Sequence, residues 1–253
     1  MSRETAKNYE DRIAHGDFEK YLHGKGIDIG GGEDCLVLPE SVQGKVYLWD
    51  LQNGDAQYLH RIQDNVFDFV YSSHCLEHMR DVKCALMNWI RVCRWGGVLY
   101  ICVPHETWYE KGIWPSKNNK DHKHSFTTYE KSSMPCNIVV KELLSEFEDI
   151  LEVLEIRENL KNYDFGCDKD IDQTEKYENM VCAQIEFIVR KKKMQLTKKW
   201  RVVNNMRYYK DYWHVMVPIQ MQMKVSKILP QGVKRSIKNV IILLQRRLLC
   251  TRD

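Results

Sequence analysis

Short runs of consecutive apolar residues recur along the first half of the chain. They lie at 26–30 (GIDIG), 45–51 (KVYLWDL), 66–72 (VFDFVYS) and 98–104 (VLYICVP). Runs without polar alternation are typical of strands that helices cover on both faces, which is the arrangement of a parallel sheet. Two further strands are predicted near 151–158 and 181–190.

A helical pattern separates the last two of these four runs. Between 81 and 94 the apolar residues fall three or four positions apart, at Val82, Ala85, Leu86, Trp89, Ile90 and Cys93. This spacing predicts a helix, which we expect Gly96-Gly97 to end with a left-handed cap. A second helix is predicted near 140–148, whereas residues 105–135 are polar and irregular, as in loops that cover or line a binding site. The alternation of strands and helices predicts an α/β domain.

Charge divides the chain into two parts. The 253 residues carry a formal net charge of +3. Residues 1–190 hold 22 Lys and Arg against 33 Asp and Glu, whereas residues 191–253 hold 16 against 2. We therefore predict an acidic α/β domain over residues 1–192 and a basic, aromatic-rich helical extension over residues 193–253.

The extension is predicted to contact a partner. Residues 195–229 mix aromatic side chains and methionines with lysines, and the apolar positions after Pro230 lie on one helical face. Three interpretations of residues 195–250 remain open. They pack on the chain's own domain or on a second subunit, they lie peripherally on an anionic membrane, or they bind RNA.

The sequence favours a cytoplasmic protein. The first twelve residues are largely polar and charged, and no run of 18 residues is both uncharged and apolar. The nine cysteines occur singly, without a CxxC pair, which suits a reducing compartment better than a disulfide framework. If the extension binds lipid, the protein lies at the inner face of the cell membrane.

The first strand runs directly into three glycines, Gly30, Gly31 and Gly32. Glycine is needed where backbone turns sharply or lies against a ligand, although a plain tight turn has the same composition. The next strand ends at Asp50, twenty residues beyond Gly30, where an acid in nucleotide-binding folds accepts hydrogen bonds from a ribose. A dinucleotide site is the alternative, but its GxGxxG pattern would put Cys35 at the third glycine.

Four segments in order resemble the class I S-adenosyl-L-methionine-dependent methyltransferases. Asp28-x-Gly30-x-Gly32 resembles the DxGxG signature of that family, and 54–59 (GDAQYL) resembles its GDAxxL segment. Residues 66–78 (VFDFVYSSHCLEH) are similar to its fourth strand with the following LEH, and 91–99 (RVCRWGGVL) to its glycine turn and fifth strand. Two positions depart from the pattern, because Asp34 replaces a common glycine and Trp95 replaces the usual proline.

The resemblance implies a Rossmann-like three-layer sandwich with a mostly parallel seven-stranded sheet, an antiparallel closing strand and, in this chain, the helical C-terminal extension. S-adenosyl-L-methionine is the implied cofactor. The residues expected to hold it are Asp28, Gly30, Gly31, Gly32, Asp50, Leu51, Asp55, Ala56, Ser72 and His74.

A hydroxyl acceptor must lose a proton, so a base is expected near the acceptor, after the fourth and fifth strands. Residues 121–127 (DHKHSFT) resemble a segment of small methyltransferases from bacterial capsule and lipopolysaccharide clusters. This favours His124 as the base or acceptor clamp, then His122, with His78 of the LEH segment as a further candidate. No metal site is predicted, because His122 and His124 alone in a loop would be a poor one.

The acceptor is expected to be a small molecule, most simply a sugar hydroxyl, free or nucleotide-linked, in surface polysaccharide biosynthesis. Residues 71–74 (YSSH) do not match the (D/N)PP(Y/F) motif of enzymes that methylate base amines. The acidic domain also lacks the clustered basic residues that follow a phosphate backbone, which makes nucleic acid an unfavoured partner. Two alternatives stay open, namely a nucleic-acid methyltransferase that uses the basic extension, and a non-catalytic cofactor-binding scaffold.

Overall fold

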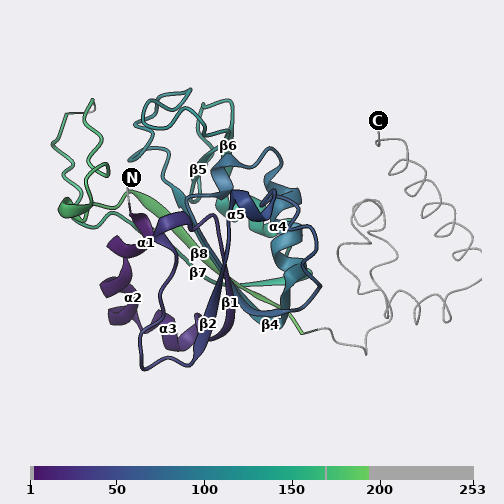
Figure 1. Cartoon of the computed structure of the whole chain (residues 1–253). Coiled ribbons are helices and arrows are strands. Elements are labelled where there is room, and N and C mark those ends of the chain that lie inside the picture. The colour runs from purple at the N-terminus through teal and green to yellow at the C-terminus, as the bar shows by residue number, and fades with distance from the viewer. Residues whose placement is uncertain (1–2, 169, 194–253) are drawn as a thin grey trace, which may run out of the picture. The chain divides into compact units, whose positions relative to one another are not determined.

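The computed structural model describes residues 3–168 and 170–193 of the chain (Figure 1). The predicted extension, apart from Lys193, lies outside these residues, so its boundaries and partners stay predictions. Within the described part no helix is long and apolar enough to cross a bilayer. All of its cysteines are free thiols.

A six-stranded sheet forms the centre of the described domain. Its strands, in spatial order, are β2 (Gly44–Trp49), β1 (Gly24–Ile29), β3 (Phe67–Ser73), β4 (Cys93–Pro104), β8 (Gln184–Lys191) and β7 (Leu151–Asn159). The first four are parallel, whereas β8 runs antiparallel to both of its neighbours. The prediction of a mostly parallel sheet with an antiparallel closing strand is confirmed.

The prediction of seven strands is wrong, since the sheet of the described domain has six and ends at β2. The missing strand would have to form between Asp50 and β3. That segment contains the 3₁₀ turn η2 (Leu51–Asn53) and then turns. Leu59, Arg61 and Asn65 adopt positive φ angles of 47°, 74° and 60°. Such angles belong to the left-handed region and interrupt extended backbone.

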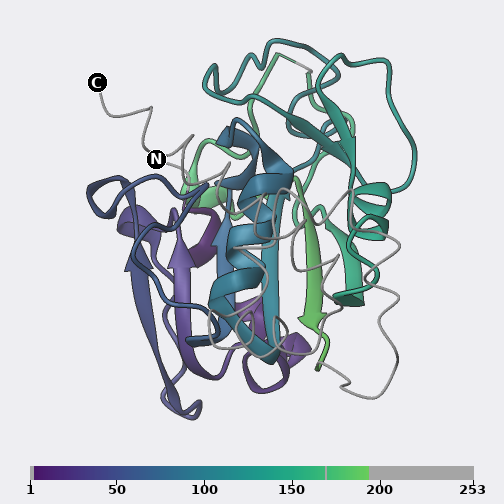
Figure 2. The same ribbon diagram turned by 90° about the vertical axis from the view of Figure 1, so that its right-hand side faces the viewer.

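Helices cover the sheet on both sides (Figures 1 and 2). One side carries α4 (Val82–Val92) and α5 (Val140–Ser145), and in Figure 2 α4 lies in front of the strands. The other side carries α1 (Glu4–Lys7), α2 (Tyr9–His15) and α3 (Asp17–Lys20). The connection between β1 and β2 contains only the 3₁₀ turn η1 (Gly32–Asp34) and no helix. The helices that cover this side of the sheet therefore come from the N-terminal segment.

Helix α4 begins as predicted but ends differently. The Asp81 carboxylate caps its start by accepting a hydrogen bond from the Cys84 amide at 2.9 Å. The predicted glycine cap is wrong, because Cys93 is already extended and Gly96-Gly97 lies within β4. A Cβ on Gly97 would lie 2.6 Å from the Asp68 carbonyl oxygen, so this glycine permits close strand packing instead.

The predicted irregular segment 105–135 contains one short strand, β5 (Ser125–Thr127), which pairs in parallel with β6 (Asn137–Val139). The described residues also form two other 3₁₀ turns, which are η3 (Leu76–His78) directly after β3 and η4 (Tyr177–Asn179) before β8. Turn η3 places the LEH segment at the carboxyl end of the parallel sheet.

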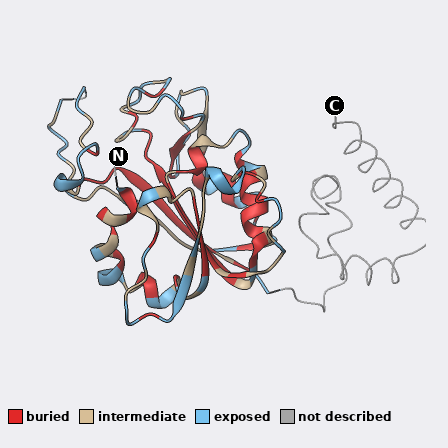
Figure 3. Ribbon diagram, viewed as in Figure 1, coloured by how far each residue is buried: buried red, intermediate tan, exposed pale blue. Residues whose placement is uncertain are grey.

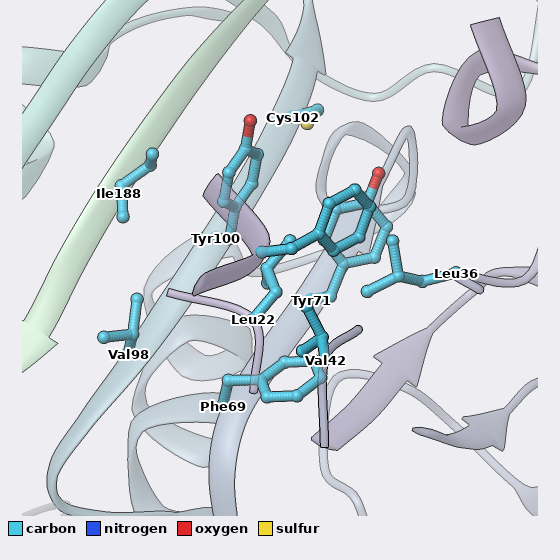
Figure 4. Close-up of a cluster of buried hydrophobic side chains, with 10 residues drawn as sticks. Leu22, Leu36, Val42, Phe69, Tyr71, Val98, Tyr100, Cys102 and Ile188 are labelled. Atoms are coloured by element: carbon cyan, nitrogen blue, oxygen red, sulfur yellow. The ribbon is translucent and has the colours of Figure 1, made fainter. Parts of the chain in front are cut away.

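The core lies between the sheet and the helix layers, where buried residues concentrate along the central strands (Figure 3). On the α1–α3 side, Phe18 and Leu22 pack with side chains of β3 and β4, among them Phe69, Tyr71 and Tyr100 (Figure 4). Burial of each such large apolar side chain contributes about 1.5–3 kcal/mol. These contacts hold β3 and β4, the two strands whose ends carry the histidine-rich segments.

A buried ion pair joins β7 to β8 beneath this layer. Arg157 donates to Glu186 at 2.7 Å and also contacts Asp17 of α3, while the Tyr100 hydroxyl donates to Glu186 at 2.7 Å. Burial alone would raise the pKa of Glu186. Arg157 and Arg12 outweigh it and lower that pKa from 4.5 to about 2. Glu186 is therefore ionised in the folded protein at neutral pH.

We expect Arg157→Met to lower the free energy of unfolding at neutral pH by about 3 kcal/mol, because it leaves the Glu186 charge buried without its partner. Chemical denaturation measures the change. Since the folded pKa of Glu186 is depressed, the pair's contribution is present above the unfolded value of 4.5 and is lost as pH falls toward 2.

The matched control is Arg190→Met, which removes the exposed pair with Glu152 (3.2 Å). Its cost should stay below about 1 kcal/mol. Equal losses in the two variants would contradict the importance of the buried pair.

Candidate functional site

The glycine loop after β1 is shaped mainly by its protein neighbours. Gly30 has φ of 81°, and a Cβ there would lie 2.6 Å from the Cys75 sulfur. A Cβ on Gly31 would lie 2.4 Å from Asp28 Oδ2. Side chains at these two positions would therefore displace the loop, which holds bare backbone at the carboxyl end of the sheet.

Asp28 lies buried beneath this loop. Its Oδ2 accepts a hydrogen bond from the Leu36 amide at 2.7 Å, whereas Oδ1 has no hydrogen-bond partner among the described residues. Burial raises the pKa of Asp28 to about 7, although the Leu36 hydrogen bond opposes the rise. A buried oxygen without a partner is costly, and a ligand donor could satisfy it.

Asp34, which stands where the family has a glycine, ties the loop to the N-terminal segment. Its carboxylate accepts hydrogen bonds from the amides of Thr5 at 2.6 Å and Ala6 at 3.1 Å. Both amides belong to α1, whose first-turn N–H groups have no partner within the helix. Asp34 thus attaches the end of the glycine loop to helix α1.

Asp50 lies at the end of β2, where its side chain forms a capping box with Asn53. Its Oδ1 accepts from the Leu51 amide at 2.8 Å and so caps η2. Oδ2 faces the glycine loop, since a Cβ on Gly32 would lie 3.4 Å from it. Leu51 is 91% exposed, which leaves an apolar side chain beside the acid. This combination suits a ribose with an adjoining aromatic base.

Asp55 and Ala56 lie in the turn that follows. The exposed Asp55 carboxylate accepts from the Gln57 amide at 2.8 Å and pairs with Arg80 at 3.0 Å. The Ala56 carbonyl accepts from the Trp89 indole at 2.9 Å. A nucleobase at Asp55 would replace an exposed ion pair, which costs little.

Two predicted cofactor residues of β3 have their side chains engaged elsewhere. Ser72 is fully buried, and its hydroxyl donates to the Ile29 carbonyl at 2.9 Å. This hydrogen bond fixes the end of β1, and the assignment of Ser72 as a cofactor residue stays a prediction. His74 follows with φ of 53°, and its Nε2 lies 3.1 Å from Gln184 Oε1. This turns the His74 ring toward Glu77.

Glu77 is the centre of a histidine cluster. Its side chain is 0% exposed, and neither carboxylate oxygen has a hydrogen-bond partner among the described residues. Three ring nitrogens surround Oε1, namely His74 Nδ1 at 3.8 Å, His78 Nε2 at 3.9 Å and His122 Nε2 at 3.8 Å. One ligand atom from each of Glu77, His78 and His122 lies within 4.8 Å of the others. These three residues could hold a metal ion.

The long loop reaches this cluster through its backbone. The amides of Lys123 and His124 donate to the Glu77 carbonyl at 2.9 and 3.3 Å. His122 is thereby buried against Glu77, with its ring stacked on Tyr109 at 5.5 Å between centroids. The HKH segment therefore contacts η3, although His122 and His124 lie 44 to 47 positions after Glu77 and His78 in the chain.

The predicted bases His122 and His124 have different partners. His122 Nδ1 lies 2.6 Å from Glu110 Oε1, whereas His124 Nε2 lies 3.0 Å from the Met79 carbonyl oxygen. His78 Nδ1 lies 3.3 Å from the Asp121 carbonyl. Burial lowers the pKa of His78 and of His124.

Sequence reasoning missed Glu110 and underrated Glu77. Glu110 is 1% exposed and orients His122, but it stands in no motif. Glu77 was noted only as part of the LEH resemblance. An acid beside a histidine in LEH was the available signal, whereas only the fold brings Glu110 to the cluster.

The comparisons identify the domain. Residues 27–101 match the family described as methyltransferase domain. The match runs from β1 to β4 and so includes the glycine loop, Asp50 and Glu77. Together with the strand order, it gives this chain the Rossmann-like fold of class I methyltransferases. The protein is an S-adenosyl-L-methionine-dependent methyltransferase, and S-adenosyl-L-methionine is its cofactor.

Several solved structures are similar at low identity. A candidate sarcosine dimethylglycine methyltransferase from Galdieria sulphuraria has 13% identity and a TM-score of 0.48, covering 74% of this chain and 85% of its own. An S-adenosylmethionine-dependent methyltransferase from Methanosarcina mazei has 15% identity and a TM-score of 0.44, covering 70% and 98%. The YcgJ protein from Bacillus subtilis has 10% identity and a TM-score of 0.44, covering 72% and 97%. No curated protein matches the chain in sequence.

The residues at the glycine loop fit this cofactor. Among the described residues Asp28 has an unsatisfied buried oxygen, the loop is bare backbone, and the Asp50 carboxylate faces Gly32 beside an exposed Leu51. When bound, the cofactor supplies a methyl group on a positively charged sulfur. Which of the predicted residues contacts which part of the cofactor stays a prediction.

We expect Asp50→Ala to weaken S-adenosyl-L-methionine binding at least about tenfold, or about 1.4 kcal/mol, because a charge-assisted hydrogen bond to the ribose is lost. Isothermal titration calorimetry measures this change. Asp68→Ala is the control, since Asp68 pairs with Arg94 away from the loop. An unchanged affinity in Asp50→Ala would show that the ribose acid is misassigned.

Asp28→Asn should alter how stability depends on pH. The folded pKa of Asp28 is raised, so its contribution is present below the unfolded value of 3.8 and is lost as pH rises through about 7. The amide does not titrate and can still accept from Leu36. Between about pH 5 and about pH 8 the variant should gain on the order of 2–3 kcal/mol relative to the unsubstituted protein. Chemical denaturation without the cofactor measures the free energy of unfolding of both proteins across this pH range. A difference between them that does not change with pH would refute the raised pKa of Asp28.

Proposed function

We propose that this methyltransferase methylates a hydroxyl of a sugar, free or nucleotide-linked, in the biosynthesis of a surface polysaccharide, with a loop histidine as general base. The observation that carries the proposal is the cluster of histidines around Glu77. It lies just after β3, at the carboxyl edge of the parallel sheet where ligands of open α/β folds bind. A hydroxyl needs a base near the methyl donor, and neutral imidazoles are suited to that role.

His124 is the proposed base. Its Nε2 faces the Met79 carbonyl, an acceptor, so the ring carries its proton on Nε2 and keeps a lone pair on Nδ1. His122 and His78 instead direct their Nε2 atoms toward Glu77. Among the described contacts, His124 is thus the one of the three predicted bases with neither ring nitrogen directed at a carboxylate.

Two features favour a small polar acceptor over nucleic acid. The end of β3 is Ser72-Ser73-His74, and Ser72 is tied to the Ile29 carbonyl, so it does not form a clamp for a base amine. Residues 1–190 carry an excess of 11 acidic charges, which repels a phosphate backbone. The likeness of 121–127 to a segment in capsule and lipopolysaccharide enzymes supports a carbohydrate.

The acceptor class is tested by following cofactor-dependent methyl transfer to nucleotide sugars and, separately, to RNA and DNA oligonucleotides. Methylated sugar with no methylated oligonucleotide is the expected result. Turnover on oligonucleotides alone would favour the nucleic-acid alternative, and cofactor binding without turnover on any acceptor would favour a scaffold.

His124→Ala should lower kcat by about 100- to 10,000-fold on the accepted sugar while cofactor affinity is unchanged. His124→Gln can still donate to the Met79 carbonyl but cannot take a proton, so it should lose activity to the same extent. If His124→Gln keeps its activity, the residue only anchors the loop. The exposed His23→Gln serves as the control, with unchanged kcat.

A further inference from the structure

We propose that Glu77, His78 and His122 bind a divalent first-row transition-metal ion, of which zinc and manganese are examples. Glu77 Oε1 lies 3.9 Å from His78 Nε2 and 3.8 Å from His122 Nε2, and one ligand atom from each of the three residues lies within 4.8 Å of the others. Zinc bonds of 2.0–2.1 Å in tetrahedral geometry would separate such ligands by about 3.3–3.4 Å. Small side-chain rotations close this difference.

The two histidines present the correct nitrogen to an ion. His122 Nδ1 faces Glu110 Oε1 at 2.6 Å, and His78 Nδ1 faces the Asp121 carbonyl at 3.3 Å. Both partners are acceptors, so each ring carries its proton on Nδ1 and a lone pair on Nε2. Metal-binding histidines usually donate their other N–H to a carboxylate or carbonyl in this way. The rings lie edge to face at 79°, which lets both lone pairs converge near Glu77.

Glu77 supplies a second, independent observation. Its carboxylate is 0% exposed, yet neither oxygen has a hydrogen-bond partner among the described residues. A buried carboxylate without a hydrogen bond or a close ion pair is strongly unfavourable. The surrounding imidazole nitrogens, at 3.8–3.9 Å, are too far away to form hydrogen bonds with it. A cation between these groups would satisfy the carboxylate and the lone pairs together.

Three protein ligands leave coordination positions open. Carboxylate and imidazole ligands with open positions suit ions such as zinc, manganese and iron(II). If the proposed function holds, a sugar hydroxyl can occupy an open position, where the ion lowers the pKa of the hydroxyl. The O–H proton would pass to His124, and the hydroxyl oxygen would form a bond to the methyl carbon as the sulfur–carbon bond of the cofactor breaks. The sulfur would keep that electron pair as a neutral thioether, and the ion would keep its oxidation state. The binding of the ion itself does not depend on this role.

The test uses the full-length, tag-free protein, first stripped with a chelator and then titrated with cobalt(II) and zinc(II). Cobalt should bind at one site per chain and give the visible absorption of nitrogen and oxygen ligands. Glu77→Gln, His78→Gln and His122→Gln should each lower affinity at least about 100-fold. Glu110→Gln should lower it about 10- to 100-fold, because it weakens the orientation of His122. His23→Gln and His124→Gln should bind as the unsubstituted protein does.

Thermal denaturation separates lost binding from failed folding. Each variant's Tm is measured after chelation and again with saturating zinc. The unsubstituted protein should gain about 5 °C or more when free metal exceeds Kd about 100-fold, and the three ligand variants should fold but gain nothing. Glu77→Gln should be at least as stable as the unsubstituted protein without metal, since it removes a buried charge.

Several outcomes would overturn the metal site. They are equal metal affinity in the ligand variants, thiolate charge-transfer absorption in the cobalt complex, or no binding at all. Failure of the proposed function gives a different pattern, in which metal binds with the expected dependence on Glu77, His78 and His122 but no sugar is methylated.

Discussion

The site depends on two hydrogen bonds from the long loop to the backbone carbonyl of Glu77. Through them the amides of Lys123 and His124 attach the loop to η3, the turn that directly follows β3. Backbone hydrogen bonds fix position without using a functional side chain. The carboxylate of Glu77 and the rings of His78 and His122 are therefore left to interact with one another, in a buried setting where electrostatic interactions are strong.

This arrangement separates two tasks across the edge of the sheet. The ends of β1 and β2 offer bare backbone, an Asp28 oxygen unsatisfied among the described residues, and the Asp50 carboxylate facing Gly32, which suit the adenosyl part of the cofactor. The segments after β3 and β4 offer the imidazoles and buried carboxylates of the acceptor side. Because β1 and β3 are neighbours in the sheet, a methyl donor held by the first group lies beside the second.

Sequence patterns predicted the elements that local chemistry decides. The strands that became β1 to β4 and the helix beginning at Asp81 were recognisable from apolar spacing, whereas the antiparallel closing strand was implied by the family resemblance. The count of seven strands failed because positive φ angles at Leu59, Arg61 and Asn65 leave no extended segment, and of these residue types only asparagine favours that conformation. The cap at Gly96-Gly97 failed because its glycines serve strand packing, a tertiary constraint.

The sequence likewise predicted those parts of the site that local motifs encode, but not those that depend on tertiary contacts. Motif spacing located the glycine loop, Asp50 and the HKH segment, but it cannot say which nitrogen faces which partner. Thus His122 and His124, alike in sequence, have separate roles set by Glu110 and by the Met79 carbonyl. The motif that contains Ser72 likewise does not reveal that its hydroxyl donates a hydrogen bond to the Ile29 carbonyl.

The tie between Asp34 and the amides of Thr5 and Ala6 has a consequence for how the enzyme matures. Helices α1 to α3 are synthesised before any strand of the sheet, yet the layer they form packs on β3 and β4, which follow later in the chain. The cradle for the cofactor therefore cannot be completed until β4 has been synthesised. A displacement of Thr5 and Ala6 would act directly on the loop that receives the methyl donor.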